Sequence, residues 1–279
     1  MMHPSINRRP VQKVENTDRR DAEDDIAVEE PLEIRLRFGQ RGVTIEQPIS
    51  ITMRTPGHDV ELALGFLFTE GILPDAAAIK NIETHDQSVT VALAPEIMPD
   101  ITKLQRHFYT SSSCGVCGKS SIEALRRVCP NLSGAEWNID SNTLYSLPQQ
   151  LRQQQDVFQA TGGLHAAALF HHKGQFITLR EDIGRHNAVD KLIGHLLQSD
   201  KLPASEHILL LSGRACYELI QKAAMAGISF MAAVSAPSSL AIQTAEAYGI
   251  TLVGFLRDNR FNVYTDTQRL LNINTPIHA

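Results

Sequence analysis

The chain has 279 residues, of which 26 are Lys or Arg and 31 are Asp or Glu, so its formal net charge is −5. This length can bury one large core or two modest ones, and the acidic balance argues against a nucleic-acid partner held by bulk electrostatics. No apolar run reaches the roughly 18 residues of a membrane span. The N-terminus lacks the apolar region of a secretory signal, and four cysteines are too few for a disulfide framework. These features predict a cytoplasmic protein with reduced thiols.

The N-terminal third begins with a polar, charged stretch. Its first 30 residues hold eight acids and five bases and show no hydrophobic periodicity, so we expect residues 1–29 to form a disordered tail. Apolar residues then alternate over 32–38 and resume after the turn at 39–42, which is the pattern of a β-hairpin. A third apolar stretch, 49–53, extends the predicted sheet.

A helix and another strand follow in the same third. Residues 59–71 are mostly apolar, with Asp59 as a candidate N-cap and a glycine at the end. Residues 88–94 have the pattern of a strand, and a helix is expected over 118–128. The sequence thus predicts a β-rich N-terminal subdomain over 30–129 that ends in a CxxC loop and a helix.

The remaining part, residues 130–279, changes to a regular alternation of strands and helices. A helix with Pro148 in its first turn and Gly162 at its end leads into it. Strand and helix patterns then follow each other three times, which predicts an α/β layered sheet with parallel strands. The expected strands are 174–182, 207–213, 228–236, 250–258 and 260–265, and the expected helices are 184–200, 214–227 and 237–249.

Three strand-to-helix corners in this part carry groups that suit an anion. Small, hydroxyl or Arg residues occupy 182–187, 212–214 and 235–239, where the free N–H groups and the dipole of a helix start would face a ligand. Ligands of open α/β sheets bind beyond the carboxyl ends of the strands, so the corners are expected to converge. For any single corner, an ordinary helix cap is the alternative. The sequence contains no GxxxxGK[ST] or GxGxxG phosphate-binding motif.

The end of the penultimate strand offers a fourth candidate at the same edge. Arg257 and Arg260 supply two guanidiniums for phosphate, and Asp258 supplies a carboxylate that can accept from a guanine-type N–H edge. The complete candidate segment is Phe255, Leu256, Arg257, Asp258, Asn259 and Arg260.

A pair of thiols, Cys114 and Cys117, lies in the stretch TSSSCGVCGKSSIEAL over residues 110–125. A structural zinc site would need two more ligands, but no second pair exists, and only Cys129 and His107 lie near in sequence. A disulfide switch and a nucleophilic sulfur relay both fit a CxxC at a helix start, which lowers a thiol pKa. The residues alone leave these two interpretations open.

The other cysteines and histidines have simpler explanations. Cys129 and Cys216 fall within or beside predicted helices, where a cysteine is most often a small core residue. The pair His171-His172 is expected to be a solvated turn rather than a metal site. His165 raises the question of a deaminase, but the sequence lacks the neighbouring Glu of a H-x-E element, and the CxxC precedes this histidine. Deamination is therefore disfavoured, and no metal ligands are assigned.

Six segments together carry a specific resemblance. They are SSSCGVCGKSSIE at 111–123, TGGLHAA at 161–167, REDIGRHNAVDKLIG at 180–194, LSGRACYELIQKAAMAGI at 211–228, SAPSSLAIQTAEAYGITLVGF at 235–255 and RDNRFNVYT at 257–265. In this order they resemble the formate dehydrogenase accessory sulfurtransferase family, usually written FdhD. The resemblance covers essentially everything after the N-terminal tail.

This resemblance implies a sulfur carrier that takes persulfide sulfur from a cysteine desulfurase. It implies delivery of that sulfur to the bis-molybdopterin guanine dinucleotide cofactor, which is the bound substrate, for insertion into formate dehydrogenase. The family's persulfide cysteine corresponds to Cys114, with Cys117 as its pair, and its cofactor-contacting segment corresponds to Phe255–Arg260. The resemblance further implies a homodimer and a cytidine deaminase-like fold for the α/β cofactor-binding domain over 130–279.

Overall fold

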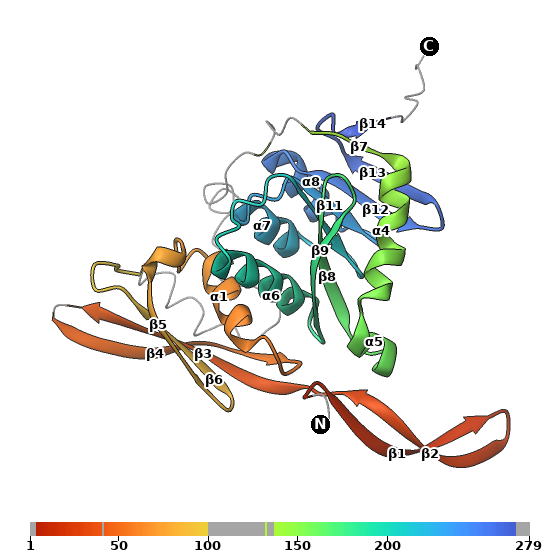
Figure 1. Cartoon of the computed structure of the whole chain (residues 1–279), viewed down its shortest axis with the longest axis horizontal. Helices are drawn as coiled ribbons and strands as arrows, with labels where there is room; N and C mark the ends of the chain where they lie inside the picture. The colour runs from red at the N-terminus through yellow and green to blue at the C-terminus, as the bar shows by residue number, and fades with distance from the viewer. Residues whose placement is uncertain (1–3, 41, 100–131, 133–136, 272–279) are drawn as a thin grey trace.

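The computed structural model describes residues 4–40, 42–99, 132 and 137–271. The described part contains a six-stranded central sheet, a four-stranded N-terminal sheet and two two-stranded sheets (Figure 1). This arrangement confirms the prediction of a mixed α/β fold with a β-rich N-terminal part. The likeness of the central sheet to cytidine deaminases stays a prediction.

The first correction concerns residues 1–29, which were expected to be disordered. Strands β1 (Ile6–Glu15) and β2 (Asp18–Ala27) instead form an antiparallel hairpin. It projects from the rest of the chain, with α5 (Asp156–Thr161) beside its base (Figure 1). The hairpin is largely exposed, so its sequence has no apolar periodicity to reveal it.

Opposite charges on the two strands help to pair the hairpin. Arg8 Nε donates to Asp25 Oδ1 at 2.8 Å, and Lys13 Nζ lies 3.4 Å from Asp24 Oδ1. Cross-strand charge pairs of this kind stabilise a sheet by roughly 0.2–1 kcal/mol each. The charged composition that indicated disorder is therefore compatible with two paired strands.

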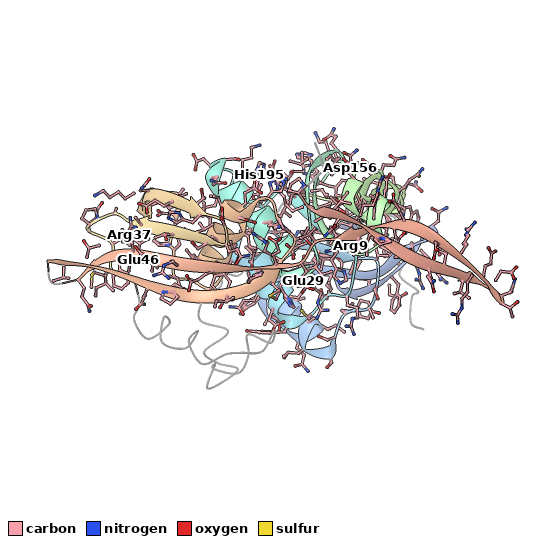
Figure 2. The ribbon with its side chains drawn as sticks, turned by 90° about the horizontal axis from the view of Figure 1, so that it is seen from below. Arg9, Glu29, Arg37, Glu46, Asp156 and His195 are labelled. Carbon is pink, nitrogen blue, oxygen red and sulfur yellow. The ribbon has the colours of Figure 1, made fainter. Side chains whose placement is uncertain are left out.

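The N-terminal sheet has the strand order β4-β3-β6-β5. Its members are β3 (Glu30–Gln40), β4 (Val43–Arg54), β5 (Ile79–His85) and β6 (Ser88–Leu93). The stretch expected as a third strand, 49–53, is the continuation of β4 beyond a register shift opposite Ile34 and Arg35. Arg37 and Glu46 lie together on β3 and β4 and form an ion pair of 2.8 Å (Figure 2).

Helix α1 (Asp59–Thr69) confirms the helix predicted after this hairpin, but Asp59 is not its N-cap. The N-cap is His58, whose φ is 59°. The Asp59 carboxylate instead accepts two hydrogen bonds of 2.9 Å from the guanidinium of Arg54, which is 2% exposed. Asp59 thus compensates the buried charge of Arg54, and a capping pattern in the sequence does not reveal this role.

The central sheet has the order β13-β12-β11-β10-β8-β9. Its strands are β8 (His165–His171), β9 (Phe176–Asp182), β10 (His207–Leu211), β11 (Phe230–Ala233), β12 (Thr251–Arg257) and β13 (Arg260–Thr265). Only β10, β11 and β12 pair in parallel, whereas β8, β9 and β13 pair antiparallel with their neighbours. The predicted parallel sheet is therefore a mixed sheet with a parallel centre.

Helices cover both faces of this sheet (Figure 1). On one face lie α6 (Arg185–Gln198), α7 (Tyr217–Met225) and α8 (Ser239–Tyr248). On the other lies α4 (Ser141–Gln153), with the short pair β7 (Ile139–Asp140) and β14 (Leu270–Leu271) near its start. Because strand side chains alternate, Leu209 and Leu211 join the core on the α6 face while Ile208 and Leu210 join the α4 face.

The start of α4 corrects the prediction that Pro148 opens this helix. Helix α4 begins at Ser141, seven residues earlier, and contains Pro148 in its interior. The carboxylate of Asp140 caps it by accepting from the backbone N–H of Asn142 at 2.8 Å and of Thr143 at 3.1 Å. These cap bonds stabilise the first turn of α4 and so offset the backbone hydrogen bond that Pro148 cannot donate.

One core joins the N-terminal sheet to the central sheet. A single cluster of buried side chains includes Leu36 of β3, Leu64 of α1, Leu192 of α6 and Met231 of β11. The predicted division at residue 130 stays a prediction, but the described parts on either side of it share this core.

Candidate functional site

The predicted strand-to-helix corners lie at one edge of the central sheet. Strand β8 pairs antiparallel with both β9 and β10, so β9 runs in the same direction as β10, β11 and β12. Their carboxyl ends therefore meet at one edge, which we call the strand edge. It comprises 182–187, 212–218, 235–239 and 255–260, together with His165 at the start of β8.

Hydrogen bonds fix neighbouring segments of the strand edge to one another. The backbone N–H of Ala166 donates to Ser212 Oγ at 2.8 Å. The N–H of Ser238 donates to the carbonyl of Ala215 at 3.0 Å, and that of Phe255 donates to the carbonyl of Ser235 at 3.2 Å. The corners are thus parts of one contiguous surface, as the sequence predicted.

Around His165, this surface brings together the guanidiniums of Arg185 and Arg214 and a second imidazole, that of His186. His165 is partly buried, and its pKa is lowered first by burial and then by the charges of Arg185, Arg214 and His186. Its ring lies close to Gly213, since a Cβ added to this glycine would be 3.2 Å from Nδ1. The positive charges of Arg185, Arg214 and His186 make this part of the strand edge electropositive.

Arg185 and the helix starts add donors that suit an anion. The buried Nε of Arg185 has no hydrogen-bond partner among the described residues, and Arg214 is exposed. Helices α6 and α7 start at Gly184 and Cys216 without a side-chain cap, whereas Ser238 caps α8 by accepting from Ala241 N–H at 3.2 Å. Uncapped N–H groups and the positive helix dipole both favour a bound anion.

Buried polar side chains next to the strand edge fix its position through hydrogen bonds and an ion pair. Asp182 Oδ1 accepts from the N–H of Gly184 at 2.8 Å and from Asn187 Nδ2 at 3.0 Å. Its Oδ2 lies 2.7 Å from Lys191 Nζ and accepts from the N–H of Thr55 at 3.2 Å. The polar residues of REDIGRHNAVDKLIG thus mainly attach the corner to β9, α6 and the N-terminal sheet.

The candidate segment 255–260 comprises the end of β12, a two-residue turn and the first residue of β13. Asp258 and Asn259 have φ values of 52° and 53° and make the two-residue turn between the paired residues Arg257 and Arg260. These four residues are exposed. Leu256 is fully buried in the core facing α4, so its side chain packs there. The assignment of the segment 255–260 to the cofactor stays a prediction.

The sequence analysis missed a triad at the start of α7. His186 Nε2 lies 3.2 Å from Cys216 Sγ and 3.0 Å from Glu218 Oε2, and Cys216 Sγ lies 3.3 Å from the same carboxylate oxygen. Cys216 packs against the core, as its helical position predicted, but it is only partly buried and its sulfur also contacts two polar side chains. The sequence signals were a cysteine at a helix start and an acid two residues later, but they point to no partner 30 residues away.

Burial by itself lowers the pKa of His186, but hydrogen bonds to Cys216 and Glu218 raise it to about 9. The hydrogen bond and charge of His186 correspondingly lower the pKa of Glu218 to about 2. The imidazole is thus an imidazolium near neutral pH, held between a carboxylate and a thiol.

Among the residues that the structure describes, two groups of side chains have donor atoms close enough to share a metal ion. One is the triad, whose three atoms already contact each other; the other is His171, His172 and Glu206. In the latter, His172 stacks on the ring of Trp137 at 5.3 Å between centroids, and burial lowers its pKa. The expectation of a simple solvated histidine pair is therefore incomplete.

The two thiols singled out from the sequence, Cys114 and Cys117, lie outside the described residues, as do His107 and Cys129.

No helix in the described part of the chain is both long and apolar enough to cross a membrane.

The fold and the strand edge together define a layered α/β protein with an electropositive loop surface. Comparison with known proteins narrows this class. The chain matches the FdhD/NarQ family over residues 27–271 and belongs to that family.

Curated relatives and a solved structure agree with this assignment. The sulfur carrier protein FdhD of Streptomyces avermitilis is 51% identical, with 88% of this chain and 89% of the relative covered. The protein of the same name from Sulfurisphaera tokodaii is 42% identical, with 95% and 99% covered. The crystal structure of a protein from Desulfotalea psychrophila, described as a formate dehydrogenase accessory protein, has a TM-score of 0.73 at 23% identity. It covers 96% of this chain and 100% of its own, and shows that the fold is shared.

Proposed function

We propose that the protein is a sulfurtransferase of the sulfur-carrier type that takes persulfide sulfur from a cysteine desulfurase. The Cys114 thiolate attacks the outer sulfur of the desulfurase persulfide, and the desulfurase cysteine leaves as a thiolate. The carrier then passes the sulfur to bis-molybdopterin guanine dinucleotide, which formate dehydrogenase requires. Family membership and the names of the curated relatives support the sulfur-carrier role.

The observation that carries this proposal in the described structure is the electropositive strand edge. The proposed substrate carries two pyrophosphate groups, each of which needs cationic and N–H donors. Arg185, Arg214 and the uncapped starts of α6 and α7 provide such donors on one surface. Arg257 and Arg260 add two exposed guanidiniums in the β12–β13 turn.

The sulfur-carrier role is tested by intact mass spectrometry. The protein is incubated with a cysteine desulfurase and L-cysteine, alongside Cys114→Ala and Cys117→Ala variants. We expect the wild-type mass to rise by about one sulfur atom, reversibly with a thiol reductant, and Cys114→Ala to lose the gain at that site. Absence of sulfur on Cys114, together with stoichiometric zinc, would refute the carrier role and indicate a structural metal module.

We propose that the carrier acts in the cytoplasm as a homodimer. Strand β4 is an edge strand of the N-terminal sheet and exposes Ile51 at 68% and Met53 at 48%. Exposed apolar side chains on an outermost strand of a sheet favour burial against another chain. Light scattering coupled to size exclusion should give twice the 30.8 kDa chain mass. If replacing both Ile51 and Met53 with Ser yields a monomer, the dimer interface includes β4.

A further inference from the structure

Cys216 is the thiol that the described structure places at the strand edge. It is partly buried, carries no disulfide and precedes the first turn of α7. A partly exposed thiol at a helix start has both access to a reactant and the favourable helix dipole. The proposed transfer through Cys114 assigns no part to it.

The geometry around Cys216 is that of a thiol paired with an imidazolium. His186 Nε2 lies 3.2 Å from Sγ, within the distance at which an imidazole hydrogen-bonds to sulfur. Glu218 Oε2 lies 3.0 Å from the same nitrogen, so the carboxylate and the sulfur share one N–H donor of the ring. A cysteine beside a cationic histidine at a helix start favours the thiolate, which is the nucleophilic form of the sulfur.

The charges around the triad do not all act in one direction on its pKa values. Arg185 and Arg214 lie at the strand edge close enough to affect His165, and Lys222 lowers the pKa of Glu218. Burial by itself raises the pKa of the Cys216 thiol, as does the Glu218 charge. The hydrogen bond and charge of His186 outweigh both, so the pKa of Cys216 is lowered. The thiolate fraction at neutral pH is therefore larger than that of an ordinary cysteine.

We propose that Cys216 is a second sulfur-accepting thiol, which takes a sulfane sulfur from a persulfide at the strand edge. The proposal goes beyond the carrier role of Cys114 and rests on it only for the identity of the donor in the cell. It places the sulfur beside Arg185 and Arg214, on the surface to which we assign the cofactor.

The transfer balances without an external oxidant. The Cys216 thiolate attacks the outer sulfur of a donor R–S–S–H, so a new S–S bond forms at Cys216 and the donor S–S bond breaks. The proton stays on the transferred outer sulfur. The leaving thiolate R–S⁻ takes the proton of the His186 imidazolium and departs as R–SH. The products are Cys216–S–S–H, neutral His186 and the reduced donor.

Glutathione persulfide as the donor tests Cys216 without the desulfurase. The full chain carrying Cys114→Ala and Cys117→Ala is treated with this donor, and its peptides are analysed by mass spectrometry. We expect the Cys216 peptide to gain one sulfur atom that a thiol reductant removes, and the additional Cys216→Ser change to abolish the gain. No sulfur on the Cys216 peptide would overturn the proposal, whatever the desulfurase assay shows for Cys114.

The role of His186 is tested by the pH dependence of Cys216 alkylation with iodoacetamide. We expect the wild-type midpoint to lie below the ~8.5 of an ordinary thiol. In His186→Gln the midpoint should rise and the rate at pH 7 fall about tenfold. The matched control is His85→Gln, which replaces an exposed histidine on β5 and should leave both values unchanged.

Circular dichroism checks that His186→Gln is folded. If it is not, the wild-type midpoint alone decides, and a midpoint at or above that of an ordinary thiol overturns the proposal. Alkylation of wild-type Cys216 only after treatment with a chelator would likewise overturn it, because the triad would then be holding a metal ion.

Discussion

Asp182 and Lys191 form a buried ion pair directly under the strand edge. The carboxylate oxygen Oδ2 lies 2.7 Å from Nζ, and the two side chains are 0% and 1% exposed. Lys191 Nζ also donates to the carbonyl of Thr55 at 2.8 Å, in the segment between β4 and α1. The pair therefore links the corner that begins α6 to the N-terminal part of the chain.

Replacing one member of this pair should destabilise the fold strongly. Asp182→Asn leaves the Lys191 ammonium without its counter-charge and replaces one of two acceptor oxygens, of which Oδ2 accepts from Thr55 and Oδ1 from Asn187, with an amide N–H₂. Breaking a buried pair typically costs about 3–5 kcal/mol, and we expect a loss of this size in urea unfolding. Glu246→Gln, which removes an exposed carboxylate on α8, should cost less than about 0.5 kcal/mol. Equal stability of the two variants would contradict this assignment.

Two glycines allow α1 and α6 to cross closely. A Cβ added to Gly65 would lie 1.8 Å from the carbonyl oxygen of Asp190, and one added to Gly194 would lie 1.8 Å from that of Glu61. Because backbone atoms cannot move aside as a side-chain tip can, Gly65→Ala should destabilise the protein by about 3 kcal/mol or more. Gly39→Ala on β3, with nothing within 4 Å, is the control. A thermal melt of Gly65→Ala that matches this control would show that the helices separate at little cost.

Local patterns predicted the central sheet and the strand edge because each depends on neighbours in sequence. The apolar run at 207–211 and the Ser-Gly-Arg that follows it define the end of β10 without reference to other strands. The common edge then follows from the direction of the strands. Antiparallel pairing of β8 with β10 was not predictable, because the sequence does not state which strands become neighbours.

Features that depend on distant partners could not be predicted from sequence. Asp59 resembles a cap until Arg54 is known to be buried beside it. Cys216 resembles a core residue until α6 brings His186 within 3.2 Å of its sulfur. In each case the local pattern is compatible with several roles of the side chain, and the tertiary contact decides which role it has.

Glu61 should make stability depend on pH in acid. Burial by itself raises the pKa of its carboxyl, but hydrogen bonds from Arg180 and His58 lower it to about 2, from 4.5. The unfolded chain therefore binds a proton first as pH falls, so this stabilisation is present above pH 4.5 and is lost between 4.5 and about 2. We expect the loss of unfolding free energy on acidification to be smaller in Glu61→Gln by on the order of 2 kcal/mol. Urea titrations at several pH values measure this difference. An unchanged pH slope would assign acid sensitivity to other carboxylates.

Arg185 should contribute to binding of the pyrophosphate groups. Its buried Nε has no partner among the described residues, so an anion at the strand edge would supply one. A hydrogen bond to a charged group contributes roughly 1.5–3 kcal/mol, so Arg185→Gln should weaken GDP binding about 10- to 100-fold in calorimetric titration. Arg152→Gln, at the exposed end of α4, is the control. Equal weakening in both variants would indicate a general effect of charge.

Asp258 should distinguish guanine from adenine at the β12–β13 turn. Its exposed carboxylate has two acceptor oxygens, which match the two adjacent N–H donors on the edge of guanine, whereas adenine lacks that donor pair. Asp258→Asn keeps one acceptor and replaces the other with a donor. We therefore expect the ratio of GDP to ADP affinity to fall by about tenfold or more, since a hydrogen bond to a charged group contributes roughly 1.5–3 kcal/mol. Asp86→Asn, in the exposed turn between β5 and β6, should leave the ratio unchanged. If Asp258→Asn binds both nucleotides with the wild-type preference, recognition of the base lies elsewhere and the turn contributes only its two guanidiniums.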